Sequence, residues 1–488
     1  MWRFAYYPEG GERSAPDLRG AYLVGVDGIP VRGEVRLDGQ MIVCESRNPE
    51  ALGLSVLWPV EGYGTVQLET TRLASREEPY HLHTELARHR LMRISTKREE
   101  WGLYDYPAME QVAARIDEAR DLFLKALQTA DNPVAAARLA DRALAVAVAV
   151  SEELCRFHAG VFLNRRRQAG GFARSFLGVA LPPTAPPRAL TKRFLEAFDF
   201  VRIPFVWREV EAEARQARYE PCDRWVNACT KAGLAVHGGP LLNFGVQSVP
   251  DWAHTWENDY EAIATFARDH IRRTVQRYAE QISTWVVASG LHADSVFPFT
   301  FEQMIELTRM AVNVTRQVAP RAQVVLDLIQ PWGEYFARNQ RTAPPLLYAE
   351  MAVQSGISFD AFGVQFLFGM DSEGFHYRDM LQVSTLIDRL ANLGKPLHVT
   401  ACAVPSDHAA AGSVDRRWTE SMQADWLADL AAIALSRPYV ECICLQTLTD
   451  RVCTGIPTGG VLRADLTPKP AFDRLAELRL DFLGGAPR

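Results

Sequence analysis

The feature that most constrains this fold is an alternation of short apolar runs with helical stretches from about residue 171 onward. Apolar runs alternating with helical segments are typical of a parallel sheet built from βαβ units. Eight such units predict a closed (β/α)8 TIM barrel, and the absence of a Gly-rich phosphate loop after the first run disfavours a doubly wound open sheet. The eight runs span residues 175–180, 200–205, 235–242, 284–288, 323–328, 359–365, 396–402 and 441–447, with helices predicted between them, for example over 260–280, 301–318 and 420–436.

The first 170 residues carry two other patterns. Short runs at 22–26, 33–37, 41–44 and 65–68 are separated by Gly, Pro and Asp-Gly turns, which predicts strands. Apolar side chains then recur at helical spacing from Val112 to Leu127, Asn132-Pro133 interrupts them, and a second helix is predicted to about residue 167. We therefore expect a small sandwich-like β-rich domain over 1–98, an αα-hairpin over 99–170 and the barrel over 171–488.

Composition limits the cellular setting and the partners. Hydrophobic residues make up 48% and the net charge is -6, so the chain is expected to be globular and lacks the basic face of a nucleic-acid binder. The most apolar stretch, 143–150, is too short to span a membrane. The opening MWRFAYYPEG does not resemble a signal peptide, and eight scattered cysteines fit reduced thiols. We expect a cytoplasmic protein without a metal or cofactor.

In a (β/α)8 barrel the working face is built from the carboxyl ends of the strands. Candidate functional residues are therefore those at or just after each predicted strand. They are Trp207, Glu209, Asn243, Ser289, Gly290, Asp327, Gln365, Ala401, Cys402 and Gln446.

Four segments over about residues 171–485 resemble glycoside hydrolase family 10, the xylanase-type retaining barrels. Residues 239–252 (GPLLNFGVQSVPDW) are similar to its G-H-T-L-V-W-H…P-x-W segment, and 362–365 (FGVQ) to its G-x-Q-x-H strand. Residues 270–285 resemble the lead into its fourth strand, and 448–471 its L-T-D…P-K-P-A-Y ending. The resemblance implies hydrolysis of β-linked sugars by two glutamates about 5 Å apart.

The same resemblance indicates that both glutamates are replaced. The acid of W-D-V-V-N-E falls on Gly290 in WVVASG, and the nucleophile of I-T-E-L-D falls on Ala401 in VTACA. Among the family's sugar-contacting positions that we matched, Gln365 alone is retained. The resemblance therefore implies the family's fold without its xylanase chemistry.

Other groups at the predicted mouth offer weaker candidates. Glu209 and Asp327 follow strand ends and are the candidate substitute carboxylates, although a solvated helix start for Glu209 and a loop cap for Asp327 are the favoured interpretations. Cys402 and His398 are four residues apart on a strand, about 13 Å, so we interpret Cys402 as a packing residue. His81-x-His83 with Glu85 is interpreted as a polar strand face rather than as a metal site.

Three functions remain open from the sequence. The first is a non-catalytic barrel that binds a carbohydrate or similar small ligand. The second is a carbohydrate-active hydrolase with relocated carboxylates, and the third is a structural protein that uses the barrel as a scaffold, with a protein partner reached through residues 1–170. For the first, the expected ligand is a neutral oligosaccharide, and the candidate ligand-binding residues are Gln365, Trp207, Asn243, Gln446 and Trp332.

Overall fold

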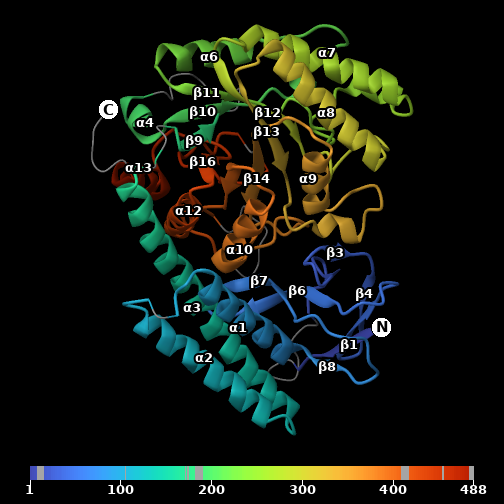
Figure 1. Cartoon of the computed structure of the whole chain (residues 1–488), viewed down its shortest axis with the longest axis vertical. Coiled ribbons are helices and arrows are strands. Elements are labelled where there is room, and N and C mark those ends of the chain that lie inside the picture. The colour runs from blue at the N-terminus through green and yellow to red at the C-terminus, as the bar shows by residue number, and fades with distance from the viewer. Residues whose placement is uncertain are drawn as a thin grey trace.

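The computed structural model describes residues 1–7, 16–104, 106–170, 172, 175–181, 191–407, 417–452 and 455–482. Its centre is a closed barrel of parallel strands in the order β10-β11-β12-β13-β14-β15-β16-β9 (Figure 1). The predicted (β/α)8 barrel is confirmed, and each of the eight predicted runs overlaps one strand. These are β9 (Leu177–Ala180), β10 (Phe200–Ile203), β11 (Ala235–Gly238), β12 (Ile282–Ser289), β13 (Gln323–Leu328), β14 (Ala361–Leu367), β15 (Leu397–Ala403) and β16 (Val440–Leu445).

Helices surround the barrel and bury one apolar face each against the strands. Several begin at residues that cap them: Thr300 and Asp379 each form a capping box with the glutamine three residues later. The helices are α4 (Lys192–Ala197), α5 (Trp207–Val210), α6 (Glu220–Lys231), α7 (Tyr260–Tyr278), α8 (Phe301–Val318), α9 (Pro345–Gln354), α10 (Met380–Ala391), α12 (Glu420–Leu435) and α13 (Pro470–Phe482), with 3-10 turns η2 (Asp251–Trp256) and η3 (Glu334–Ala337).

The amino-terminal end of the barrel interior holds a polar network. His398 Nε2 lies 2.8 Å from Glu441, and Gln323 donates to the same carboxylate at 2.8 Å. Burial acts to lower the pKa of His398, but the neighbouring Cys442 and Glu441 raise it to about 10. His398 is therefore held as a cation at this end of the barrel, away from the carboxyl ends of the strands.

The described residues up to His81 form two four-stranded sheets beside the barrel (Figure 1). One has the order β4-β5-β1-β8 and the other β3-β2-β6-β7. The strands are β1 (Trp2–Ala5), β2 (Tyr22–Val24), β3 (Pro30–Val31), β4 (Glu34–Asp38), β5 (Met41–Glu45), β6 (Gly53–Val60), β7 (Gly64–Glu69) and β8 (Tyr80–His81). The predicted β-rich region is present.

Three helices follow: α1 (Leu82–Glu100), α2 (Glu110–Gln128) and α3 (Pro133–Gln168). The predicted pair over 99–170 is confirmed as α2 and α3, which pack along each other. The expectation of strand structure through residue 98 is wrong, because α1 begins at Leu82. His81 caps α1, accepting from the Thr84 amide, and His83 bonds Asp141, so this pair does not lie on one strand face.

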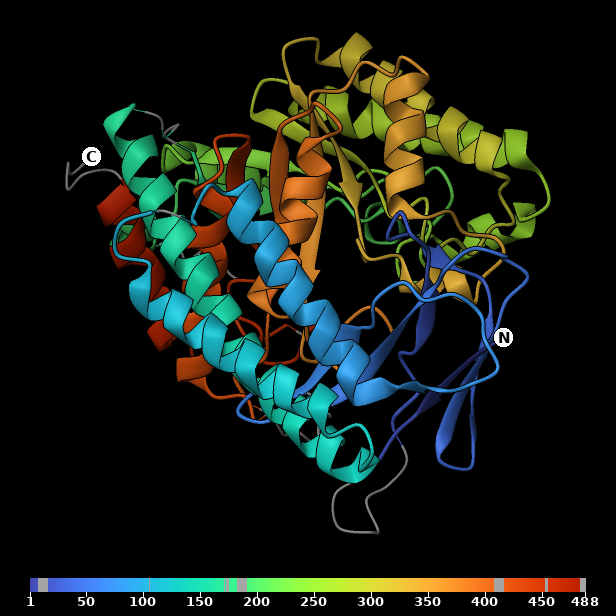
Figure 2. The ribbon, with the colours of Figure 1, turned by 60° about the horizontal axis from the view of Figure 1, so that its bottom comes forward.

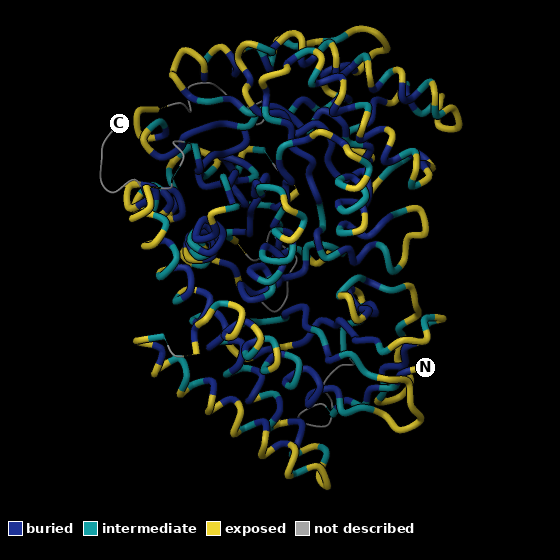
Figure 3. Tube along the Cα trace, in the orientation of Figure 1, coloured by how far each residue is buried: buried dark blue, intermediate teal, exposed yellow. Residues whose placement is uncertain are grey.

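The leading segment, residues 1–170, packs directly on the barrel. Figure 2 shows α3 running beside the barrel, and α3 contacts both α10 and α12. Arg90 of α1 forms a buried ion pair with Asp379, the cap of α10. Figure 3 shows buried residues along the facing sides of these elements and exposed residues along the outer edge of α2. Among the described residues, no helix is long and apolar enough to cross a membrane.

Candidate functional site at the carboxyl end of the barrel

A buried carboxylate connects four adjacent strands at the carboxyl end of the barrel. Asp327 of β13 accepts hydrogen bonds from Ser289 Oγ of β12 at 2.7 Å, from Gln365 Nε2 of β14 at 2.5 Å and from Thr400 Oγ1 of β15. Gly363 makes room for it, since a Cβ there would lie 2.5 Å from Asp327 Oδ1. With three donors and only 2% exposure, Asp327 organises the strand ends and is not free in the mouth, contrary to its candidacy as a catalytic substitute.

The two positions matched to the family's glutamates lie beside this carboxylate. Gly290 directly follows Ser289, and Ala401 directly follows Thr400. Ser289 and Thr400 are the residues that donate hydrogen bonds to Asp327. Gly290 has φ +72°, a left-handed conformation that side chains rarely adopt, and a Cβ there would lie 2.5 Å from Ile329 Cδ1. Ala401 is buried and pairs with Gln365 in the strand register. The geometry at Gly290 therefore disfavours any side chain.

Exposed carboxylates are found on the loops that follow β10 and β12. Glu209 lies in the first turn of the short helix α5 and is exposed, as expected for a solvated helix start. Asp294, which the sequence analysis did not select, is also exposed, and its amide bonds Gly290 O. Although both residues are exposed as a whole, desolvation of their carboxyl groups raises the pKa of each above its ordinary value.

Trp207 is placed away from solvent, at 2% exposure. Its indole donates to Glu211 at 3.1 Å, and its ring stacks on His270 of α7 and meets Trp252 edge-on. Arg273 of α7 pairs with the same Glu211 carboxylate at 2.7 Å. This burial argues against the expected role of Trp207 in stacking on a sugar, and it assigns the residue to the packing between α5 and α7.

The other candidate ligand-binding residues are half-buried, so their side chains retain solvent access. Gln365 uses one amide N–H on Asp327, which leaves its second N–H and its carbonyl for a ligand. Asn243 accepts from the Gly245 amide at 2.8 Å, and Gln446 follows β16. Trp332 lies outside the strand wall, against Phe366 and Phe368, rather than over the mouth. Polar groups therefore remain at the mouth, whereas the two selected aromatic rings lie elsewhere.

The Cys402 thiol and the described histidines are the remaining groups that a nucleophilic or metal site would use. Cys402 is buried at 2% exposure, its thiol contacts the Cys444 carbonyl, and burial raises its pKa well above the ordinary value, as expected for a packing residue. Within the described ranges, no group of three or more His, Cys, Asp or Glu side chains is arranged to hold a metal ion.

The model of glycosyl hydrolase family 10 matches residues 205–477, more than half of the sequence. The chain belongs to glycosyl hydrolase family 10. The family match starts at the end of β10, so the leading segment lies outside it.

Proteins similar to this family-10 chain include xylanases. Endo-1,4-beta-xylanase B of Thermotoga neapolitana is 21% identical over 286 residues, covering 56% of this chain and 77% of the relative. A thermostable mutant of a xylanase from Cellvibrio japonicus superposes with a TM-score of 0.50 at 16% identity, covering 63% of this chain and 98% of that one. Xylanase 10B of Thermotoga petrophila in complex with xylobiose gives 0.47 at 18% identity, covering 63% and 95%. At 16% identity the Cellvibrio japonicus structure shows a shared fold alone.

Sequence reasoning located the strand ends of the family-10 barrel but not the contacts between them. The hydrogen bonds to Asp327 come from residues 38 or 73 positions away in the sequence, so no local sequence pattern predicts them. Asp294 was missed because it lies five residues beyond the end of β12. The contacts of Asp327 and the position of Asp294 near the mouth both follow only from the three-dimensional structure.

Proposed function

We propose that this protein is a non-catalytic member of family 10 that binds a neutral carbohydrate at the carboxyl end of its barrel. The observation that supports this most directly is the conformation of Gly290. The left-handed backbone would strain any side chain where the resemblance places the acid, and Ile329 Cδ1, 2.5 Å from an added Cβ, would have to move. Ala401 likewise offers no nucleophile at the second position. The retaining mechanism requires both groups.

Binding does not depend on those groups. A sugar site needs a few placed polar groups, and Gln365 presents an unused N–H and carbonyl beside the Asp327 carboxylate, which fixes its orientation. Asn243 and Gln446 add further amides from the loops after β11 and β16. Because such a mouth holds its ligand by few contacts, we expect a Kd near 1 mM, equivalent to about 4 kcal/mol.

Titration of xylo-oligosaccharides by calorimetry tests the binding. We expect saturable binding to wild type and a loss of about tenfold, or about 1.4 kcal/mol, for Gln365→Ala and for Gln446→Ala. Gln354→Ala is the matched control, since Gln354 is exposed at the end of α9, next to the amino-terminal end of β14. Binding that survives both mouth substitutions places the ligand elsewhere, and absence of binding to any neutral oligosaccharide favours a scaffold role.

A hydrolase with relocated carboxylates is the second candidate, favoured by Glu209 and Asp294. Both carboxylates are exposed near the mouth, and both have a raised pKa, as a general acid requires. Turnover of xylan and of 4-nitrophenyl β-xyloside decides between the two functions. Rates on the order of 1 per second that fall by 100-fold or more in Glu209→Gln or Asp294→Asn establish the hydrolase and contradict our proposal.

A further inference from the structure

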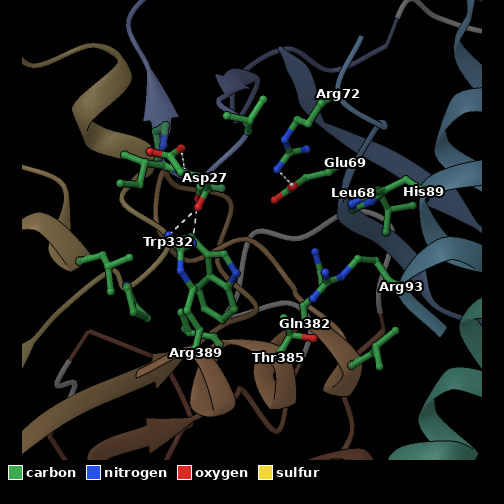
Figure 4. Close-up of a pocket in the computed structure, with 18 of the residues that line it drawn as sticks. Asp27, Leu68, Glu69, Arg72, His89, Arg93, Trp332, Gln382, Thr385 and Arg389 are labelled. Atoms are coloured by element: carbon green, nitrogen blue, oxygen red, sulfur yellow. Dashed lines mark hydrogen bonds and ion pairs between the residues drawn. The ribbon is translucent and has the colours of Figure 1, made fainter. Parts of the chain in front are cut away.

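A cavity of about 290 Å³ lies between the leading segment and the barrel (Figure 4). One side is formed by the turn after β2, the end of β7 and helix α1. The other is formed by α10, the start of α9 and the loop after β13. Trp332, which borders the cavity, packs against the outer side of β14, so this space is separate from the mouth of the barrel.

Four arginines line the cavity, and two of them are neutralised by carboxylates. Arg72 pairs with Glu69 at 3.0 Å. The second pair joins Arg90 to Asp379 and is almost completely buried. These two ion pairs contribute no net charge to the cavity, so its electrostatic character depends on the remaining arginines, Arg93 and Arg389.

Arg389 is held by backbone carbonyls rather than by a carboxylate. Its guanidinium donates to Gly28 O at 3.1 Å and to Asp27 O at 2.6 Å, both in the Asp-Gly turn after β2. Gly28 allows this approach, because a Cβ there would lie 2.9 Å from Arg389 Nη1. Arg389 thus uses two of its five N–H donors, and among the described residues no ion pair compensates its charge. Burial lowers the pKa of Arg389, but the guanidinium stays protonated.

Arg93 of α1 is the second uncompensated cation. It is half-buried, and within the part of the chain that the structure describes it has neither a hydrogen bond nor an ion pair. The acids that act electrostatically on Arg389 are Glu350, Glu69, which is already paired with Arg72, and the exposed Asp27. The Oδ1 of Asp27 already accepts from the Ile29 amide at 3.0 Å. The residues that line the cavity therefore carry an excess of positive charge, because four arginines stand against the two carboxylates of Asp27 and Glu69.

The remaining lining suits a polyhydroxylated ring. The Arg378 guanidinium lies over the Trp332 indole, 4.5 Å from the ring centroid. Trp332 is half-buried, so the rest of its flat apolar surface is available to the cavity. Burial lowers the pKa of His89 to about 4, so its imidazole is neutral at pH 7 and presents one donor and one acceptor. Thr385 adds a hydroxyl from α10, and Figure 4 shows these groups around one space.

We propose that this cavity binds a single anionic sugar ring, with its carboxylate or phosphate held by Arg93 and Arg389 and its ring against Trp332. The volume is at the lower limit for small-molecule pockets, which fits one sugar ring and excludes an oligosaccharide. The inference goes beyond the proposed function and uses none of the mouth residues. Because the walls come from both the leading segment and the barrel, bound ligand stabilises their contact.

Calorimetric titration of the full chain with glucuronate, glucose 6-phosphate, glucose and inorganic phosphate tests the proposal. We expect saturable binding of at least one of the two anionic sugars, at least tenfold weaker binding of glucose and of phosphate alone, and a rise in Tm with the bound sugar. Glucuronate and glucose 6-phosphate identify which anionic group is preferred. Affinity should fall when NaCl is raised from about 20 to about 200 mM, since screening weakens the pairing of the anion with arginine.

Arginine variants locate the site. Arg93→Gln and Arg389→Gln should each weaken binding at least tenfold, whereas Arg224→Gln, at an exposed position on α6, should not. Arg93 makes no hydrogen bond or ion pair with the residues that the structure describes, so its variant tests the site even where Arg389→Gln is unstable. Equal binding of glucose, undiminished binding in Arg93→Gln, or no binding of either anionic sugar overturns the proposal. Xylo-oligosaccharide binding in Arg93→Gln, which should be unchanged, keeps this result distinct from that at the mouth.

Discussion

Replacing Arg90 by methionine should destabilise the protein by far more than replacing any surface arginine. The side chains of Arg90 and Asp379 are 5% and 0% exposed, and Arg90 Nη1 donates to Asp379 Oδ1 at 2.9 Å. Arg90→Met keeps the aliphatic packing but leaves Asp379 as a buried charge with only backbone amides of α10 as donors. Breaking a buried pair in this way costs about 3–5 kcal/mol.

Differential scanning calorimetry measures the loss. For a chain of 488 residues that unfolds as one unit, the unfolding entropy is about 1 kcal/mol/K, so we expect Tm to fall by about 3–5 °C. The double variant Arg90→Met/Asp379→Asn should lose less, because no unpaired charge remains and asparagine still caps α10. Arg120→Met, which breaks an exposed pair with Asp117, is the control and should change stability by less than about 0.5 kcal/mol. A decrease below about 1 °C for Arg90→Met refutes the reasoning.

Three further outcomes are expected. Gly290→Glu should lower the free energy of unfolding by about 1–3 kcal/mol, measured by urea denaturation, because of the left-handed backbone and the contact with Ile329. The variant should also show no xylan hydrolysis, and measurable turnover contradicts the proposed function. His398 has a pKa of about 10 against an ordinary 6.5, so its stabilisation is complete below about pH 6.5 and is lost as the pH rises through about 10. Urea midpoints at about pH 6 and about pH 10 should therefore differ less in Glu441→Gln than in wild type, and an equal difference rejects this assignment. Asp327→Asn should lose about 1–3 kcal/mol, because an amide cannot accept all three donors, and an unchanged urea midpoint shows that the carboxylate is dispensable.

The barrel was predictable because each of its strands is a short apolar run and because helices of ordinary amphipathic period separate them. Strand β13 has the bounds that the sequence predicted, and α2 and α3 lie where the apolar spacing placed them. Strand β6 was missed because nearly all of its residues are buried, so it lacks the alternation that marks a half-exposed strand. Helix α1 was missed because its composition is polar on average and its buried face mixes apolar residues such as Leu86 and Ile94 with charged ones such as Arg90.

The candidate site was predictable in position but not in chemistry. Residues at the strand ends do lie at one end of the barrel, as the topology requires. Which of them are free depends on contacts across the sheet: Asp327 is occupied by three donors and Trp207 by Glu211. The cavity with Arg93 and Arg389 joins residues almost 300 positions apart, and no sequence motif marks it.

The length of α3 determines whether the barrel can be produced without the leading segment. At 36 residues the helix is about 54 Å long, and its carboxyl-terminal half lies on α10 and α12. There Arg166 donates to the carbonyls of Leu435, Arg437 and Val440, between α12 and β16. A truncated product that begins at residue 171 would leave α10 and α12 without the helix that packs on them and those carbonyls without their donor. The isolated barrel should therefore aggregate or bind a helix of another molecule in place of α3. Expression of the barrel should include the leading segment.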